Sequence, residues 1–203
     1  MKVMIIDYKM GNLGSVKRSL EECGASVLLS DNPKDLKTAE RFVLPGVGAF
    51  SDGMRQLTQD GWIPEILEAV RDGVPMLGIC LGMQLLAEKG SEGGETEGLG
   101  LIEGEVKRMT PENSQTRLPH VGWNEVSPLK PAPILNGIPA GTDFYFVHSY
   151  HFIPKNSQDA AAETPYCGKF TSVVSKENVF GVQFHPEKSG KPGFQILNNF
   201  LRV

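Results

Sequence analysis

A single cysteine stands between two glycines in the stretch LGICLGMQLL, residues 77–86. An apolar run precedes Cys80 and a helical pattern follows it, so the sequence predicts a sharp strand-to-helix turn with the cysteine at its corner. Such a corner lifts the side chain out of the chain, and the N-terminus of the next helix favours the thiolate form of a thiol. The same pattern also fits a small apolar residue in a tight place, because free cysteine is among the residue types most often buried.

A cysteine nucleophile needs a base, and the base needs a group that orients it. His185 and Glu187 stand two positions apart after the apolar run VFGVQF. Side chains two apart in an extended segment point to the same face, so we expect Glu187 to hold the ring of His185 while that ring faces Cys80. A strand-end histidine beside a surface glutamate is the alternative for this pair taken alone.

The stretch VLPGVGAF, residues 43–50, ends a predicted strand with glycines at 46 and 48. It departs from the G-x-G-x-x-G fingerprint of dinucleotide-binding loops. A flexible backbone that supplies an N–H to an oxyanion fits the pattern better, with a second donor at Leu81 directly after the cysteine.

The first half of the chain alternates short apolar runs with helical patterns. The predicted strands are 2–7, 26–30, 41–46 and 74–79, and the predicted helices are 12–24, 50–60, 62–72 and 81–89. This alternation predicts an α/β fold with an open, mostly parallel twisted sheet and helices on both faces.

The second half predicts strands joined by turns, several of them antiparallel, in LGLIEGEVKRM, VGWNEVSPL, TDFYFVHSYHF and KFTSVVSKENVFGVQFHPE. Glu177 and Asn178 are typical of a hairpin turn between two β-rich runs. The last 14 residues or so predict an amphipathic closing helix, and residues 88–98 predict a polar, glycine-rich loop beside the Cys80 helix.

Composition narrows the class of protein. A length of 203 residues suits a single domain, 1–203, and a net charge of −4 gives no electrostatic footprint for nucleic acid. The chain has no apolar run of about 18 residues, and its N-terminus reads as a core strand, so we expect no membrane span and a cytoplasmic protein. Three scattered cysteines and four histidines lack the spacing of a metal site and suit a reducing compartment.

Taken together, these segments resemble the class I, triad-type glutamine amidotransferases, which have a flavodoxin-like α/β fold. The resemblance is carried by GICLGMQLL, by FHPEKS around His185 and by PGVG at 45–48. Three further stretches, IDYKMGNLGSV (6–16), LPHVGWNEV (118–126) and YFVHSYHF (145–152), are similar to the glutaminase subunits of imidazole glycerol phosphate synthase. One departure is Lys9, where those subunits more often have glycine, and we expect it to affect a partner-facing loop.

The resemblance implies a hydrolase of the L-glutamine side-chain amide that needs no cofactor and no metal. Cys80 would be the nucleophile, His185 the base and then the acid, and Glu187 the orienting group, with a glutamyl thioester as intermediate. Two sets of binding residues are implied as well: Gly46, Val47, Gly48 and Leu81 for the oxyanion hole, and Gln84, Glu92 and the backbone of Ser149 and Tyr150 for the ends of glutamine.

The resemblance also implies a heterodimer with a cyclase subunit, a (β/α)8 barrel that receives ammonia and makes imidazole glycerol phosphate and AICAR in histidine biosynthesis. Free ammonia in water at pH 7 becomes ammonium and loses its nucleophilicity, which is a physical reason for such a partner. Asn12, Trp123 and Lys188 would lie at or near the interface. A core position for Trp123 and a merely solvated Lys188 are the alternatives.

Other functions stay open from the sequence. The chain fits the glutaminase subunit of another ammonia-using synthase, such as those making anthranilate, p-aminobenzoate or pyridoxal phosphate. A non-catalytic binding subunit would keep the fold without turnover, and a flavodoxin-like nucleotide-binding module would need a phosphate loop. We expect His120, His148 and His151 to be structural.

Overall fold

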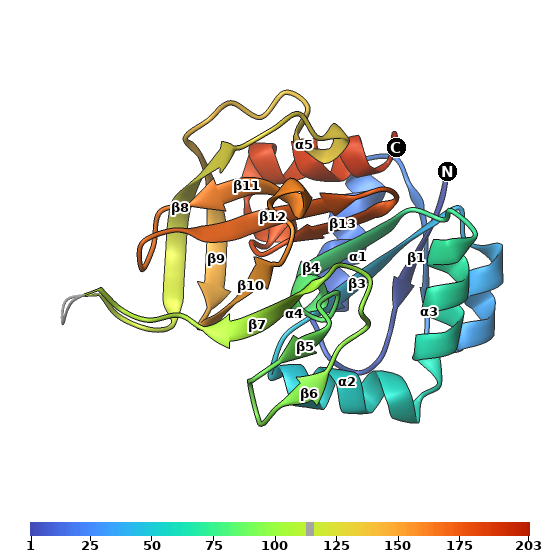
Figure 1. Ribbon diagram of the computed structural model, residues 1–203. Coiled ribbons are helices and arrows are strands. Elements are labelled where there is room, and N and C mark those ends of the chain that lie inside the picture. The colour runs from blue at the N-terminus through green and yellow to red at the C-terminus, as the bar shows by residue number, and fades with distance from the viewer. Residues whose placement is uncertain (113–115) are drawn as a thin grey trace.

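The apolar runs of the first half form neighbouring parallel strands in the computed structural model, which describes residues 1–112 and 116–203 (Figure 1). These strands are β1 (Lys2–Ile6), β2 (Ser26–Ser30), β3 (Arg41–Gly46) and β4 (Met76–Cys80). A fifth strand, β13 (Val179–Val182), comes from near the end of the chain and pairs in parallel with β4. The predicted parallel sheet is confirmed.

The antiparallel strands of the second half continue the same sheet. They are β8 (His120–Pro128), β9 (Thr142–His148), β11 (Ala160–Thr164) and β12 (Phe170–Lys176). Within the described residues the strand order is β2-β1-β3-β4-β13-β12-β11-β8-β9. The hairpin predicted at Glu177 joins β12 to β13, with Lys176 opposite Val179.

A smaller sheet lies beside this one. Its strands, in spatial order, are β10 (Tyr150–Pro154), β7 (Gly104–Arg108), β5 (Lys89–Gly90) and β6 (Thr96–Glu97). The apolar stretch TDFYFVHSYHF is therefore two strands in two sheets, separated at Ser149. The predicted polar loop at 88–98 contains β5 and β6 at its ends.

Helices cover both faces of the large sheet, as predicted. In β1, Val3 and Ile5 pack in the cluster that contains the apolar sides of α1 (Leu13–Glu22) and α5 (Gly190–Phe200). The alternate residues Met4 and Ile6 pack with α2 (Phe50–Gln59), α3 (Trp62–Arg71) and α4 (Leu81–Gln84). Short 3-10 turns complete the connections: Pro33–Thr38, Pro133–Leu135, Ser157–Asp159 and Pro186–Lys188.

The helix after Cys80 is shorter than predicted, because it ends at Gln84 and not near residue 89. Directly after Gln84 the chain tightens, because the N–H groups of Leu86 and Ala87 donate three residues back, to Met83 and Gln84. The next loop also occupies the carbonyls that a longer helix would use. The carbonyls of Leu85, Leu86 and Ala87 accept backbone N–H groups from residues 99–102, at 2.9–3.1 Å. A helix that reached residue 89 would need the Leu85 carbonyl for the N–H of that residue, so the chain leaves the helix and enters β5.

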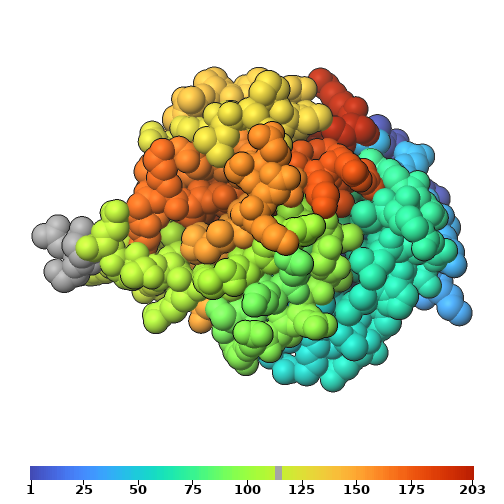
Figure 2. All heavy atoms as spheres, in the orientation of Figure 1, coloured from blue at the N-terminus to red at the C-terminus, as the bar shows by residue number. Residues whose placement is uncertain are grey.

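The two halves of the chain occupy opposite sides of the molecule, blue to green and yellow to red in the space-filling view (Figure 2). They meet in the sheet where β4 pairs with β13. No helix in the described ranges is both long and apolar enough to cross a membrane.

Candidate active site

Cys80 is the last residue of β4 and precedes α4 directly. Its backbone has φ 55° and ψ −107°, a conformation that L side chains rarely adopt. The flanking glycines are required by space: a Cβ on Gly78 would lie 2.6 Å from the carbonyl oxygen of Gly82, and a Cβ on Gly82 would overlap the carbonyl oxygen of Leu44. The predicted strand-to-helix corner is therefore present, with Cys80 in the strained position.

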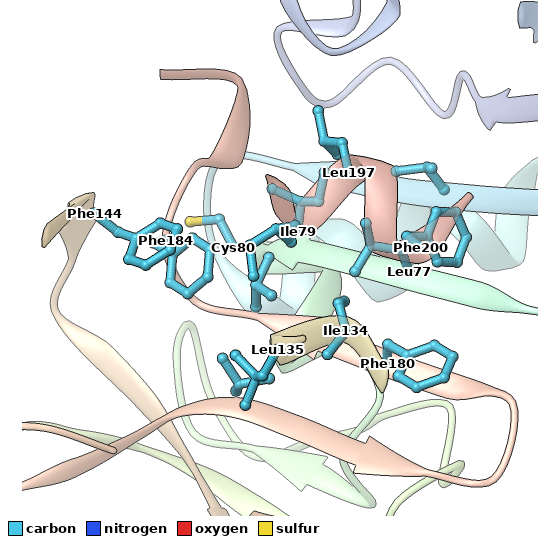
Figure 3. Packing of buried hydrophobic residues seen from close by; sticks show 14 of the residues in the cluster. Leu77, Ile79, Cys80, Ile134, Leu135, Phe144, Phe180, Phe184, Leu197 and Phe200 are labelled. Atoms are coloured by element: carbon cyan, nitrogen blue, oxygen red, sulfur yellow. The ribbon is translucent and has the colours of Figure 1, made fainter. Parts of the chain in front are cut away.

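The sulfur of Cys80 lies at the margin of the apolar packing, directed away from Leu77 and Ile79 on its own strand (Figure 3). Cys80 is only 6% exposed. Its thiol lies 3.9 Å from the carbonyl oxygen of Val147, which it can donate to, and the amide Nε2 of Gln183 lies 3.8 Å from the sulfur.

His185 reaches Cys80 because β13, the strand that leads to it, pairs with β4, with Val182 opposite Ile79. Its backbone N–H donates to the carbonyl of Tyr145 on β9, which ties the position to the large sheet. Nδ1 of His185 lies 2.8 Å from Oε1 of Glu187, and both side chains are almost fully buried. The predicted pairing is present, but its predicted cause is wrong: Glu187 lies in the 3-10 turn Pro186–Lys188 and not in an extended segment.

Electrostatics distinguish this histidine from the others. Burial alone would lower the pKa of His185, but the adjacent Cys80 sulfur and the Glu187 carboxylate outweigh burial and raise the pKa to about 10. In the part of the chain that the structure describes, Nε2 of His185 is buried without a hydrogen-bond partner. The ring is thus held at one nitrogen by a carboxylate, with the other nitrogen left for the reacting groups.

Cys80 and His185 line a cavity of about 440 Å³, and Glu187 lies behind His185, outside the lining. The sequence-predicted residues that the cavity brings together are Cys80, His185, Val47, Gly48, Leu81, Gln84, Glu92, Ser149 and Tyr150. Gly46 lies outside the lining, at the end of β3 opposite Cys80 on β4. Glycine is needed there because a Cβ would collide with the hydroxyl of Tyr8, and Gly48 has φ +115°.

The two polar side chains predicted for the ends of glutamine are already engaged by the protein. Nε2 of Gln84 donates to the carbonyl of Tyr150 at 2.9 Å and to Oε1 of Gln183 at 3.1 Å. This leaves the Gln84 carbonyl oxygen, an acceptor, for a ligand. Glu92 accepts the backbone N–H of Phe50 at the start of α2, and burial raises the pKa of its carboxyl group.

Two buried residues at the site escaped the sequence reasoning. Gln183 is fully buried and contacts the sulfur of Cys80; its signal was a lone amide in an otherwise apolar strand run. His148 was expected to be structural, yet it lines the cavity. Its ring partner His120 lies on β8, 28 positions away, so no local spacing indicates the pair.

The residues predicted for a partner interface are exposed. Trp123 on β8 is 58% exposed, which excludes the core position, and its ring lies edge-on to Tyr145 at 6.1 Å. Nζ of Lys188 lies 5.7 Å over the same Tyr145 ring. Asn12 is exposed just before α1, a helix that packs beside the Pro186–Lys188 turn.

Comparison with known proteins gives consistent relatives. The model of the class-I glutamine amidotransferase family matches residues 4–203. The imidazole glycerol phosphate synthase subunit HisH of Moorella thermoacetica is 46% identical over 198 residues, covering 98% of this chain and 93% of the relative. HisH 1 of Campylobacter jejuni strain RM1221 is 45% identical over 202 residues, covering 99% and 100%.

Solved structures share the fold at low identity. A glutamine amidotransferase crystal structure has a TM-score of 0.76 at 19% identity and covers 99% of both chains. The PurLQS structure from Thermotoga maritima has a TM-score of 0.75 at 20% identity, covering 99% of this chain and 97% of the matched chain. With a matching family model and full-length relatives near 45% identity, the chain belongs to the class-I glutamine amidotransferase family and, within it, to the HisH subunits of imidazole glycerol phosphate synthase.

Proposed function

We propose that Cys80, His185 and Glu187 hydrolyse the side-chain amide of L-glutamine to glutamate and ammonia. The observation that carries the proposal is the meeting of Cys80 and His185 at one cavity: a strained cysteine at the end of β4 and, after β13, a histidine held at 2.8 Å by the buried carboxylate of Glu187 behind it. This is the arrangement that cysteine nucleophiles need, with a base beside the thiol and a third group orienting the base.

In the first half of the reaction His185 holds the proton of the Cys80 thiol as an imidazolium, and the sulfur attacks the side-chain amide carbon of glutamine. The C=O electron pair moves onto oxygen, and the tetrahedral oxyanion then collapses with cleavage of the C–N bond. His185 gives its proton to the leaving nitrogen, so ammonia departs and a glutamyl thioester remains. Glu187 stabilises the imidazolium throughout.

In the second half neutral His185 removes a proton from water, which attacks the thioester and releases glutamate and the thiol. Backbone N–H groups of residues 46–48 and of Leu81 would stabilise the oxyanion in both halves. Glu92 and the free oxygen of Gln84 suit the α-ammonium group, and the backbone at Ser149 and Tyr150 would receive the α-carboxylate.

We further propose that the ammonia passes to a cyclase subunit, a (β/α)8 barrel, in the reaction that makes imidazole glycerol phosphate and AICAR. Identity of 44–46% to HisH subunits over nearly the full chain supports this partner. The proposed contact surface consists of the exposed Trp123 and Lys188 around the half-buried Tyr145, with Asn12 near it. Three free cysteines suit the cytoplasm as the compartment.

The test measures glutamate release from glutamine by the chain alone, with the cyclase, and with the cyclase and its nucleotide ligand. We expect little release by the chain alone and strong release by the full mixture. If the chain releases glutamate at the same rate with and without the cyclase, the glutaminase reaction is supported and the cyclase partner is refuted. Silence in every mixture, with Cys80 shown to be reduced, would overturn the glutaminase itself.

A further inference from the structure

Two buried histidines, His120 on β8 and His148 at the end of β9, form a hydrogen-bonded pair at the cavity wall. Nδ1 of His120 lies 3.1 Å from Nε2 of His148. Nδ1 of His148 lies 2.8 Å from the carbonyl oxygen of Tyr150, and Nε2 of His120 lies 3.2 Å from the amide nitrogen of Asn124. All four ring nitrogens are therefore engaged, in a line that runs from Asn124 to Tyr150.

The ends of this line fix the position of each proton. A carbonyl oxygen only accepts, so Nδ1 of His148 carries a proton. At the other end, Oδ1 of Asn124 accepts the backbone N–H of Glu125 at 2.8 Å, and Nδ2 donates to the carbonyl of Pro165 at 3.1 Å. The second hydrogen of that amide points to Nε2 of His120, which must accept it. The proton of His120 is then on Nδ1 and points to Nε2 of His148.

This order leaves no place for a further proton. A second proton on either ring would bring two N–H donors face to face along the line. The surroundings agree, because burial lowers the pKa of His120 to about 4 and that of His148 to about 3. His120 also stacks on Tyr166 at 4.0 Å between ring centroids, which fixes the plane of the ring.

The inner end of the line controls a backbone group at the site. The Tyr150 carbonyl accepts from Nδ1 of His148 and also from Nε2 of Gln84, at 2.8 and 2.9 Å. Ser149 and Tyr150 line the cavity together with Cys80. If the Tyr150 carbonyl faced the cavity, its oxygen would repel the α-carboxylate of glutamine. The two donors, His148 and Gln84, hold the carbonyl toward the protein interior instead.

We propose that His120 and His148 are positioning residues for glutamine: as a neutral, proton-ordered pair they hold the Tyr150 carbonyl and so shape the backbone at residues 149 and 150 to receive the α-carboxylate. The proposal rests on the proposed glutaminase function for its ligand. The proton order of the pair is a property of the free chain and does not depend on that function.

The first experiment records long-range ¹H–¹⁵N spectra of the full chain, labelled at histidine, at pH 7. The chain has four histidines, and single variants assign their signals. We expect His120 and His148 both to be neutral, with the proton on Nδ1. An imidazolium, or a proton on Nε2 in either ring, would overturn the proposed order.

The second experiment compares His148→Asn with His148→Leu in the complex with the cyclase and its ligand. The Asn amide nitrogen comes close to the position of Nδ1 and keeps a donor for the Tyr150 carbonyl, whereas Leu keeps bulk and removes the donor. We expect Leu to raise the KM for glutamine about tenfold with a much smaller change in kcat, and Asn to restore most of the loss. An equal KM in the two variants, or a loss confined to kcat, would contradict the positioning role.

Alkylation of Cys80 by iodoacetamide serves as the control for both variants. We expect its rate to be unchanged, because neither ring contacts the sulfur. If the wild-type complex fails to hydrolyse glutamine, the proposed glutaminase function is refuted. The proton order of the histidine pair is then still tested by the ¹H–¹⁵N spectra. A working wild type with unaffected His148→Leu would refute the positioning role alone.

Discussion

Cys80 differs from the other two cysteines in both backbone and surroundings. It occupies a strained strand end at a cavity, whereas Cys23 lies at the end of α1 with its sulfur 3.8 Å from the carbonyl of Phe194. We predict that Cys80→Ala lowers glutamate release in the full complex by more than about 1,000-fold, because the thioester cannot form. Circular dichroism and cyclase binding should stay near wild type, and Cys23→Ala should keep its activity. Substantial hydrolysis by Cys80→Ala would remove Cys80 from its role.

Gln183 places an amide N–H 3.8 Å from the Cys80 sulfur and is itself held by Gln84. A donor at that position stabilises a thiolate more than a thiol. We therefore predict that Gln183→Met, which keeps the length of the side chain and removes the donor, slows iodoacetamide alkylation of Cys80 about tenfold at pH 7.

The matched control is Gln195→Met on α5, where the same change is made far from the sulfur. Its amide bonds to Asn199 and not to the site. Equal alkylation rates in the two variants would mean that Gln183 only fills space. A slower rate in both would point to a general loss of structure, which urea unfolding of each variant would detect.

Among the elements, the β4–α4 corner depends on the absence of side chains at two glycines. We predict that Gly82→Ala lowers the free energy of unfolding by about 3 kcal/mol or more, because its Cβ would overlap the Leu44 carbonyl and force β3 and α4 apart. Gly14→Ala is the matched control: it lies in α1 with nothing near its Cβ, and should be stabilising by about 0.5–1 kcal/mol. Urea unfolding measures both, and similar values would show that the corner tolerates a side chain.

The elements that the sequence predicted correctly are those with a strong local pattern. The parallel strands are continuous apolar runs, and the hairpin at Glu177 has turn residues between β-rich segments. The strand Ala160–Thr164 was missed because alanine is depleted in strands, and pairing with β8 and β12 overrides that preference. The length of α4 was missed because residues 99–102 bond the carbonyls of Leu85–Ala87 that a longer helix would use, and that competition is not local.

The same difference between local and long-range signals separates the site residues that could be predicted from those that could not. Cys80, His185 and Glu187 carry their chemistry in residue type and short spacing, so the sequence could single them out. The pairing of His120 with His148 joins positions 28 residues apart, and the contact of Gln183 with Cys80 joins positions 103 apart. Only strand order and register bring such residues together, so no pattern within one segment could have predicted them.

For the whole molecule, the buried imidazole pair links stability to pH. The folded pKa of about 4 for His120 and about 3 for His148 lie below the unfolded value of 6.5. The unfolded chain therefore binds more protons below pH 6.5, and stability falls as the pH drops toward these folded values. Each group contributes at most about 1.4 kcal/mol per pH unit.

We predict that His148→Leu makes this acid loss shallower. Urea unfolding at pH 6.5, 5.5 and 4.5 should give a smaller difference between the highest and lowest pH for the variant than for the wild type. Parallel slopes would mean that His148 is not held neutral in the folded chain. Carboxylates contribute to both chains alike, so the comparison of slopes isolates the imidazole.

The exposed surface around Trp123 is the proposed contact with the cyclase. An indole 58% exposed on an edge-on contact with Tyr145 contributes little to folding, yet its area is available to a partner. We predict that Trp123→Ala weakens cyclase binding about tenfold or more and leaves the urea midpoint of the free chain nearly unchanged. Leu129→Ala is the control, because Leu129 is 52% exposed and lies beyond the end of β8, six residues further along the chain. Calorimetric titration of both variants with the cyclase separates the outcomes: equal loss of affinity would place the interface elsewhere or spread it over the strand. A selective loss for Trp123 would assign the cyclase to the surface that Tyr145 joins, through its backbone contact with His185, to the proposed catalytic residues.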